Sequence, residues 1–336
     1  MLTHPLTHRS RRRRALLAGL AIATGALLPL AVSAQTADAW PSKPIQLVIP
    51  YPPGGSADLL GRPLAVQLQQ QLGQPVVLEY KPGAGGTLAT QYLARAKPDG
   101  YTVLMVLAAH AINDSLYPKL PYDTRKDFAP VSLVANLPMV VAGSSKLPAR
   151  NIQELVQAAK AAPGQLTFGS AGNGNTGHLA AEYFSSLAGI RMTHVPYKGS
   201  AGVVNAMLAG DIDLTFDSIS TSMPHIRSGR MHALAVTSTK RSSLAPELAT
   251  VQEQGMTGFD VTGWYALIAP AGTPAEIRQR LSQEIGTALR QPQLQSQLAA
   301  GGYEPVGSTP DALQAHIDNE ITRWAAVVKA TGAKVD

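Results

Sequence analysis

Three glycine-rich loops, each placed directly before a segment of helical pattern, carry the residue types best suited to binding an anion. They read PPGGSAD (residues 52–58), PGAGGT (residues 82–87) and GSAGNGNTGH (residues 169–178). Glycine lets the backbone turn with its N–H groups exposed, and Ser56, Thr87 and Thr176 each supply a hydroxyl at an expected N-cap. The first turn of a helix has unpaired N–H donors and a partial positive charge, so it attracts anions. Each loop alone also fits a simple capped turn, and only convergence of the three on one cleft indicates an anion site.

The sequence GNGNTG (residues 172–177) matches the dinucleotide pattern G-x-G-x-x-G, but its surroundings argue against a nucleotide. That fold needs an acidic residue about 20 positions further on to bind the ribose hydroxyls. The corresponding stretch reads RMTHVPYKG, and from there the first acid is Asp211. The phosphate-binding pattern G-x-x-x-x-G-K-[ST] and the esterase pattern G-x-S-x-G are also absent from the sequence.

Side chains with catalytic or metal-binding potential do not form a recognised motif. The histidines beyond the N-terminal leader are His110, His178, His194, His225, His232 and His316, and they form neither H-E-x-x-H nor a close carboxylate–histidine pair of metal-binding spacing. The chain has no cysteine, which excludes disulfides, thiol nucleophiles and Cys-ligated zinc, and we expect no cofactor. His178, in a first helical turn, either donates to a ligand or packs and caps. Asp217, at the end of DLTFD, either orients a ligand amine or hydroxyl or binds a loop N–H. Asp58 lies in a first helical turn, where its negative charge is expected to stabilise the helix by interacting with the helix dipole.

The segments between the loops alternate short apolar runs with helical patterns. Strands are expected at residues 45–49, 75–80, 101–107, 165–170, 192–197, 211–217, 232–237 and 263–270. Helices are expected over the stripe Leu60, Leu64, Leu68 and Leu72, over residues 87–96, 151–162, 178–187 and 202–209, and from Pro274 and Thr309-Pro310 onward. The stretch PVSLVANLPMVVAGSSKLP reads as two apolar runs without a full helix between them, and Pro63 predicts a kink or a restarted helix. Near-continuous apolar strands alternating with helices predict a largely parallel sheet covered on both faces.

The N-terminal segment reads as a cleavable secretory signal, residues 1–34. It carries five arginines and no acid, then a long apolar run that ends in V-S-A before Gln35. An uncleaved membrane anchor is the alternative, and Arg11 to Arg14 fit a twin-arginine route as well as the general one. Removing 34 of 336 residues, with five of 28 basic ones, leaves 302 residues with 23 basic and 22 acidic side chains. This near-neutral balance gives no support for nucleic-acid binding.

The strand, glycine loop and helix of residues 45–72 are repeated in outline at residues 166–187. The two segments share this order of elements but no repeated residue pattern. Two α/β lobes that each present a glycine loop at the carboxyl edge of a sheet would bring the loops face to face across a cleft.

These motifs together resemble the Bug family, the periplasmic solute-binding receptors of tripartite tricarboxylate transporters. The matching stretches are WPSKPIQLVIP, PGGSAD, KPGAGGT, KPDGYTVL, PYDTRKDFAPVSLVA, AAPGQLTFGSAGNGNTGHLA, HVPYKGSAGVVNAMLAGDID, ALAVTSTKRS, GWYALIAPAGTP and EITRWAAVVKATG. The resemblance covers nearly the whole chain after the leader, from Trp40 onward.

The resemblance implies a two-lobed clamshell of the periplasmic binding protein type, each lobe a mostly parallel sheet flanked by helices, with two interlobe crossings. Lobe 1 would comprise residues 40–142 and 264–336, and lobe 2 residues 143–263. It also implies that loop N–H groups and small side chains hold a ligand carboxylate, partly through water. The implied positions are Gly54, Gly55, Ser56, Asp58, Gly85, Gly86 and Thr87 from one lobe, and Ser170, Ala171, Gly172, Asn173, Thr176, His178 and Asp217 from the other.

We therefore expect a periplasmic, monomeric, non-enzymatic receptor that passes a small organic carboxylate to membrane transport subunits. The scarcity of charge in the predicted cleft favours a mono- or dicarboxylate over a tricarboxylate. One alternative is a cleft hydrolase or isomerase that uses His178 and Asp217; another is a co-receptor that presents its ligand-bound form to a sensor kinase.

Overall fold

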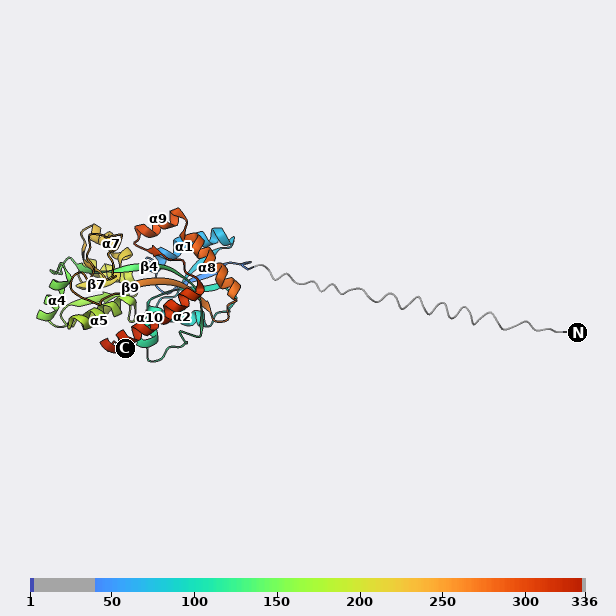
Figure 1. Cartoon of the computed structure of the whole chain (residues 1–336), viewed down its shortest axis with the longest axis horizontal. Helices are drawn as coiled ribbons and strands as arrows, with labels where there is room; N and C mark the ends of the chain where they lie inside the picture. Colours follow the sequence, from blue (N-terminus) through green and yellow to red (C-terminus); the bar gives the residue numbers. More distant parts are fainter. Residues whose placement is uncertain (3–39, 334–336) are drawn as a thin grey trace. The chain divides into compact units, whose positions relative to one another are not determined.

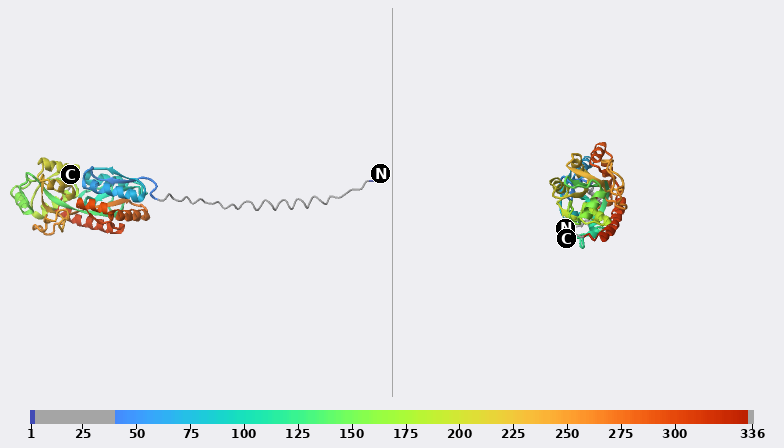
Figure 2. Two further views of the ribbon diagram at one scale, coloured as in Figure 1. Left: turned by 90° about the horizontal axis from the view of Figure 1, so that it is seen from above. Right: turned by 90° about the vertical axis from the view of Figure 1, so that its left-hand side faces the viewer.

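The computed structural model describes residues 1–2 and 40–333 of the chain. The predicted signal peptide therefore lies almost entirely outside the described residues. Trp40–Asp336 forms one compact unit, in which the blue, cyan and orange-red segments gather at one end and the green and yellow segments at the other (Figure 2).

A mixed sheet with the strand order β2-β1-β3-β9-β4-β7-β5-β6 runs through this unit, and β8 and β10 also pair with β4. The strands are β1 (Ile45–Ile49), β2 (Val76–Tyr80), β3 (Thr102–Leu107), β4 (Phe128–Ser144), β5 (Thr167–Ser170), β6 (Thr193–Pro196), β7 (Leu214–Ser218), β8 (Met231–Val236), β9 (Thr262–Pro270) and β10 (Glu304–Pro305). The outer strands pair in parallel, as predicted. The two long central strands β4 and β9 run antiparallel to their neighbours.

Helices cover the two faces of the sheet. They are α1 (Ser56–Leu72), α2 (Thr87–Ala94) after a 3-10 turn η1 (Ala84–Gly86), α3 (Ala109–Leu116), α4 (Ile152–Ala161), α5 (Thr176–Ala188), α6 (Ser200–Ala209), α7 (Ile219–Arg227), α8 (Ala275–Leu289), α9 (Pro292–Ala300) and α10 (Pro310–Thr331). The predicted leucine stripe of α1 is confirmed, since Leu60, Leu64, Leu68 and Leu72 are all buried. The predicted restart at Pro63 is wrong, because α1 continues unbroken through it.

Strand β4 corrects the prediction of two separate apolar runs between residues 130 and 148. It is a single strand of 17 residues, nearly all buried. Its partner changes between Pro138 and Met139: the earlier part pairs with β9 and the later part with β7 and β8. The pairing of β4 with β9 has two register irregularities, one of them next to Pro130. Proline has no N–H to donate, and an irregularity at this point lets the hydrogen-bonded ladder continue past it. Strands β4 and β9 lie side by side through the middle of the unit (Figure 1).

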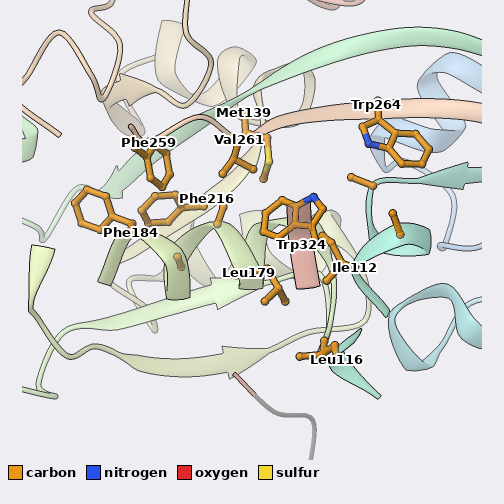
Figure 3. Close-up of a cluster of buried hydrophobic side chains, with 14 of the residues drawn as sticks. Ile112, Leu116, Met139, Leu179, Phe184, Phe216, Phe259, Val261, Trp264 and Trp324 are labelled. Atoms are coloured by element: carbon orange, nitrogen blue, oxygen red, sulfur yellow. The ribbon is translucent and has the colours of Figure 1, made fainter. Parts of the chain in front are cut away.

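The hydrophobic core continues from one half of the sheet to the other. Trp324 of α10 lies near Ile112 of α3 and Leu179 of α5 in the cluster drawn in Figure 3. Glu320, also buried, accepts hydrogen bonds from the indole Nε1 atoms of Trp264 (2.9 Å) and Trp324 (3.1 Å). Helix α10 thereby connects a central strand to helices from both halves.

Candidate functional site

A cavity lies where the first turns of α1 and α5 face each other beside the ends of β7 and β9. Its volume is about 40 Å³, and the free space around it, with its mouth, is about 500 Å³. The lining residues are Tyr51, Gly55, Ser56, Ala57, Leu107, Met139, Ala171, Asn175, Thr176, Gly177, Ser200, Asp217, Ser218, Gly263, Trp264 and Tyr265. Two of the three glycine loops therefore converge on one enclosed space.

Backbone N–H groups of both helix starts are available to a ligand in this cavity. The N–H groups of Gly55, Ser56 and Ala57 at α1, and of Thr176 and Gly177 at α5, donate to no acceptor among the described residues. All five residues line the cavity. Because the helix dipoles add positive potential at the same place, the cavity suits an anion that accepts several hydrogen bonds.

The helix caps differ by one residue from the prediction. The N-caps of α1, α2 and α5 are Gly55, Gly86 and Asn175, so the predicted hydroxyl residues occupy the first helical position instead. At α5 the Asn175 side chain accepts from the N–H of His178 at 2.8 Å. At α1 no side chain caps the helix, which leaves the Ser56 hydroxyl to other partners.

A cluster of hydroxyls joins the first and second halves of the chain at the cavity wall. Ser56 Oγ accepts hydrogen bonds from Tyr265 Oη (2.7 Å) and Ser218 Oγ (3.1 Å). Behind them, Tyr303 Oη donates to the carbonyl of Ser56 at 2.7 Å. Since both lone pairs of Ser56 Oγ are used, its own proton remains available for one further acceptor.

Asp217 lines the cavity at the carboxyl end of β7 and is only 6% exposed. Its Oδ1 accepts from the N–H of Ser218 (2.7 Å) and from Ser200 Oγ (2.9 Å), and its Oδ2 accepts from Thr221 Oγ1 at 3.4 Å. Burial raises the pKa of Asp217 to about 6, and these three hydrogen bonds partly offset the rise. The side chain thus accepts from the backbone N–H of Ser218, at the start of α7, while the residue lines the cavity.

Asp58 does not line the cavity but fastens the turn that does. Its buried carboxylate accepts from the N–H of Gly54 (2.8 Å) and from Tyr80 Oη (2.6 Å), and pairs with Arg62 Nε at 3.0 Å. Asp58 lies in the first turn of α1, and through these hydrogen bonds it also fixes the conformation of the PPGG turn.

Replacing Asp58 by alanine should lower the free energy of unfolding by about 2–3 kcal/mol, because one backbone donor and one tyrosine hydroxyl lose their acceptor. Equilibrium urea unfolding measures this. Asp58→Asn keeps one neutral acceptor and should lose roughly half as much. A loss below about 0.5 kcal/mol in the alanine variant, typical of an unimportant surface site, would contradict this role.

The loop before α2 lies at the edge of the site. Gly85 and Gly86 line a second cavity of about 10 Å³ that shares Tyr51 and Leu107 with the main one. Thr87 lines neither, and its Oγ1 donates to the carbonyl of Ala84 at 2.9 Å. The loop also meets the opposite loop closely, since a Cβ atom on Gly85 would lie 2.5 Å from the carbonyl oxygen of Asn173.

Within the loop before α5, only Ala171 and Thr176 of the predicted residues line the main cavity. His178 Nδ1 accepts from the N–H of Gly174 at 3.2 Å, and its ring stacks on His194 with centroids 3.9 Å apart. Ser170 Oγ pairs with His194 Nε2 at 2.6 Å and accepts from the N–H of Gly172 at 3.3 Å. His178 and Ser170 thus hold the loop in shape from behind.

Burial lowers the pKa of His178 to about 3, with a further contribution from His194, and lowers the pKa of His194 to about 4. Both rings are therefore neutral near pH 7. His178 and Asp217 share no hydrogen bond, so in the described residues they do not form the acid–base pair that an enzyme would need.

Several lining residues were not predicted from the sequence. Tyr51 and Ser218 each adjoin a predicted loop or residue, so one further position would have found them, and Asn175 lies within the third loop but was not chosen. Met139 and Tyr265 come from the two central strands, whose course depends on long-range pairing.

Metal binding and membrane insertion find no support in the part of the chain that is described. No group of three or more His, Asp or Glu side chains there is arranged to hold a metal ion. None of the helices at residues 40–333 combines the length and the apolar character that crossing a bilayer requires.

Comparison with known proteins gives consistent matches along the chain. The tripartite tricarboxylate transporter family receptor, TctC, matches residues 60–333. Protein BugT of Bordetella pertussis is 39% identical over 302 residues, which cover 89% of this chain and 93% of BugT. The structure of R. palustris Rpa4515 with adipate has a TM-score of 0.84 and 35% identity, over 87% of this chain and 98% of that one. MatC from Rhodopseudomonas palustris with bound malate has a TM-score of 0.82 and 30% identity, over 86% and 99%.

Proposed function

Because the chain belongs to the TctC/Bug family of tripartite tricarboxylate transporter receptors, we propose that it captures a small organic carboxylate in the periplasm and delivers it to the membrane subunits of such a transporter. The family is one of binding proteins, so the chain is a solute-binding protein and not an enzyme. The observation that supports the ligand class is a set of five backbone N–H groups at two helix starts that have no acceptor among the described residues and belong to residues lining one cavity.

Neutral donors suit a receptor that must also release its ligand. Each hydrogen bond to a charged carboxylate contributes about 1.5–3 kcal/mol. Several such bonds hold an acid firmly without an arginine or lysine in the described cavity wall, where a buried ion pair would slow release. Adipate and malate in the two relatives are both dicarboxylates, which supports a dicarboxylate for this chain.

Opening of the cavity would separate the two lobes expected at residues 40–142 with 264–336 and at residues 143–263. The contacts that would part include the Ser56–Ser218 hydrogen bond and the approach of Gly85 to Asn173. Strands β4 and β9, which continue past the cavity, would carry the hinge.

Denaturing the protein purified from the periplasm and analysing what it releases by mass spectrometry tests this function, because a ligand captured in the cell is set free and identified by its mass. A thermal-shift series with succinate, malate, glutarate and adipate follows, since a ligand that binds only the folded state raises the melting temperature. We expect one acid to raise it by several degrees. A protein that carries no acid and responds to none would refute the proposal.

Ser56→Ala should weaken binding of that acid about tenfold, or 1.4 kcal/mol, because it removes the hydroxyl proton that is available to the ligand. Isothermal titration calorimetry measures the change. Ser222→Ala is the matched control: Ser222 is fully buried, lines no part of the cavity and has no hydrogen-bond partner for its Oγ among the described residues. Equal losses in the two variants would contradict a direct role for Ser56.

A further inference from the structure

The cavity that is proposed to receive an anion contains a carboxyl group of its own. Of the described residues that line it, Asp217 alone has a carboxylate, and none is a lysine, arginine or histidine. A ligand carboxylate held at the starts of α1 and α5 shares this small space with Asp217, whose Oδ2 has only one long hydrogen bond, from Thr221 at 3.4 Å. Two negative charges at such close range in a buried cavity repel strongly.

Among the described residues, the surroundings of Asp217 offer no positive charge that would relieve the repulsion. The titratable groups that face it are three tyrosines, Tyr51 after β1, Tyr265 on β9 and Tyr303 before β10, and burial raises the pKa of each of them. Helices α6 and α7 contribute the hydroxyls of Ser200 and Thr221. On the neighbouring strand β4, Val140 pairs with Asp217, and Thr176 and Gly177 of α5 form part of the cavity wall. A proton is therefore the simplest countercharge.

We propose that binding of the carboxylate takes up one proton from solvent, which Asp217 holds while it donates a hydrogen bond from Oδ2 to the ligand. This inference rests on the proposed function. Paired carboxyl groups that share one proton are a well-known arrangement, because only one of the two can ionise at short distance. The pKa of Asp217, raised to about 6 by burial, means that the group is ionised near pH 7 before binding yet close to accepting a proton.

Proton uptake makes binding depend on pH in a defined direction. Above the pKa of free Asp217, each unit of pH makes the protonated form about tenfold rarer, so the dissociation constant should rise about tenfold per unit between pH 7 and pH 8.5. The ligand-bound receptor, with the proton on Asp217, would then bring one proton along with each ligand to the transport subunits.

Calorimetry in two buffers counts the protons directly. The probe is whichever of succinate, malate, glutarate and adipate raises the melting temperature most, titrated at pH 7.5 in phosphate and in Tris, whose ionisation enthalpies differ widely. We expect an uptake close to one proton per ligand in the wild-type protein. Asp217→Asn should take up none, and its affinity should stay constant from pH 7 to pH 8.5.

Asp213→Asn is the matched control, since Asp213 lies just ahead of β7, bonds Thr167 and does not line the cavity. It should keep both the proton uptake and the pH dependence. Tight binding to wild-type protein with zero uptake overturns the inference and leaves the proposed function intact, whereas a failure of all four acids to bind at any pH overturns both. Should Asp217→Asn not fold, the wild-type buffer comparison decides alone.

Discussion

Gly85→Ala should bind its carboxylate about 100-fold more weakly than the wild-type protein, a difference of roughly 2.7 kcal/mol. A Cβ atom at this position would lie 2.5 Å from the carbonyl oxygen of Asn173 in the opposite loop. Real Cβ atoms do not approach backbone oxygen so closely, so the loops must separate and the cavity walls with them. Isothermal titration calorimetry with the acid found in the thermal-shift series measures the loss.

Gly73→Ala separates this steric effect from backbone strain. Gly85 and Gly73 have nearly equal positive φ angles, +61° and +68°, but nothing lies within 4 Å of a Cβ atom on Gly73. Both substitutions should cost about 1 kcal/mol of stability through their left-handed conformation. Only Gly85→Ala should lose affinity, and unchanged binding in that variant would show that the two loops need not touch when ligand is bound.

Acidification should destabilise the protein by at least about 3 kcal/mol between pH 6.5 and pH 4, through histidines that are buried in their neutral form. Burial lowers the pKa of His178 to about 3 and of His194 to about 4, against about 6.5 in an unfolded chain. The unfolded state therefore takes up protons first as the pH falls. Stability is complete above pH 6.5 and decreases steadily toward the folded pKa values.

Asp217 acts with the opposite sign. Its pKa, raised to about 6, lets the folded state take up a proton before the unfolded state, which adds stability between pH 6 and pH 4. The stability lost through the two histidines exceeds the stability gained through Asp217. The free energy of unfolding should therefore still decrease as the pH falls. Urea unfolding at half-unit pH intervals measures it. His178→Asn, which offers Gly174 an acceptor that does not titrate, should flatten the slope, and an unchanged slope would assign the effect to other groups.

Local patterns predicted most of the elements around the cavity. Glycine loops between an apolar run and a helical pattern placed α1 and α5 at the correct edge of the sheet, because these signals depend on residues close in sequence. Helices α3, α7 and α9 were missed: α3 follows β3 after one residue, and α7 contains Pro224 among serines and threonines, which are weak helix formers.

The central strands and the exact site could not be predicted in the same way. The length of β4 depends on β9, β7 and β8 pairing with it from more than 70 residues away. The positions of Tyr265 and Tyr303 beside Ser56 depend on contacts more than 200 residues apart. Of the predicted site residues, Gly55, Ser56, Ala171, Thr176 and Asp217 line the main cavity. The side chains of Asp58, Ser170 and His178 instead accept hydrogen bonds from backbone N–H groups of the loops and so hold those loops in place.

The two interlobe crossings that we propose would be strands within a sheet, β4 and β9, and this would give any opening motion an elastic character. Strands β4 and β9 are hydrogen-bonded to each other up to Pro138 and Thr262, beside the cavity. Widening the cavity must therefore twist a two-stranded ribbon, which resists deformation as a spring does, whereas loose linkers would let the halves drift apart freely. How long a captured molecule stays bound would then depend on the stiffness of that ribbon as well as on the groups that touch the molecule.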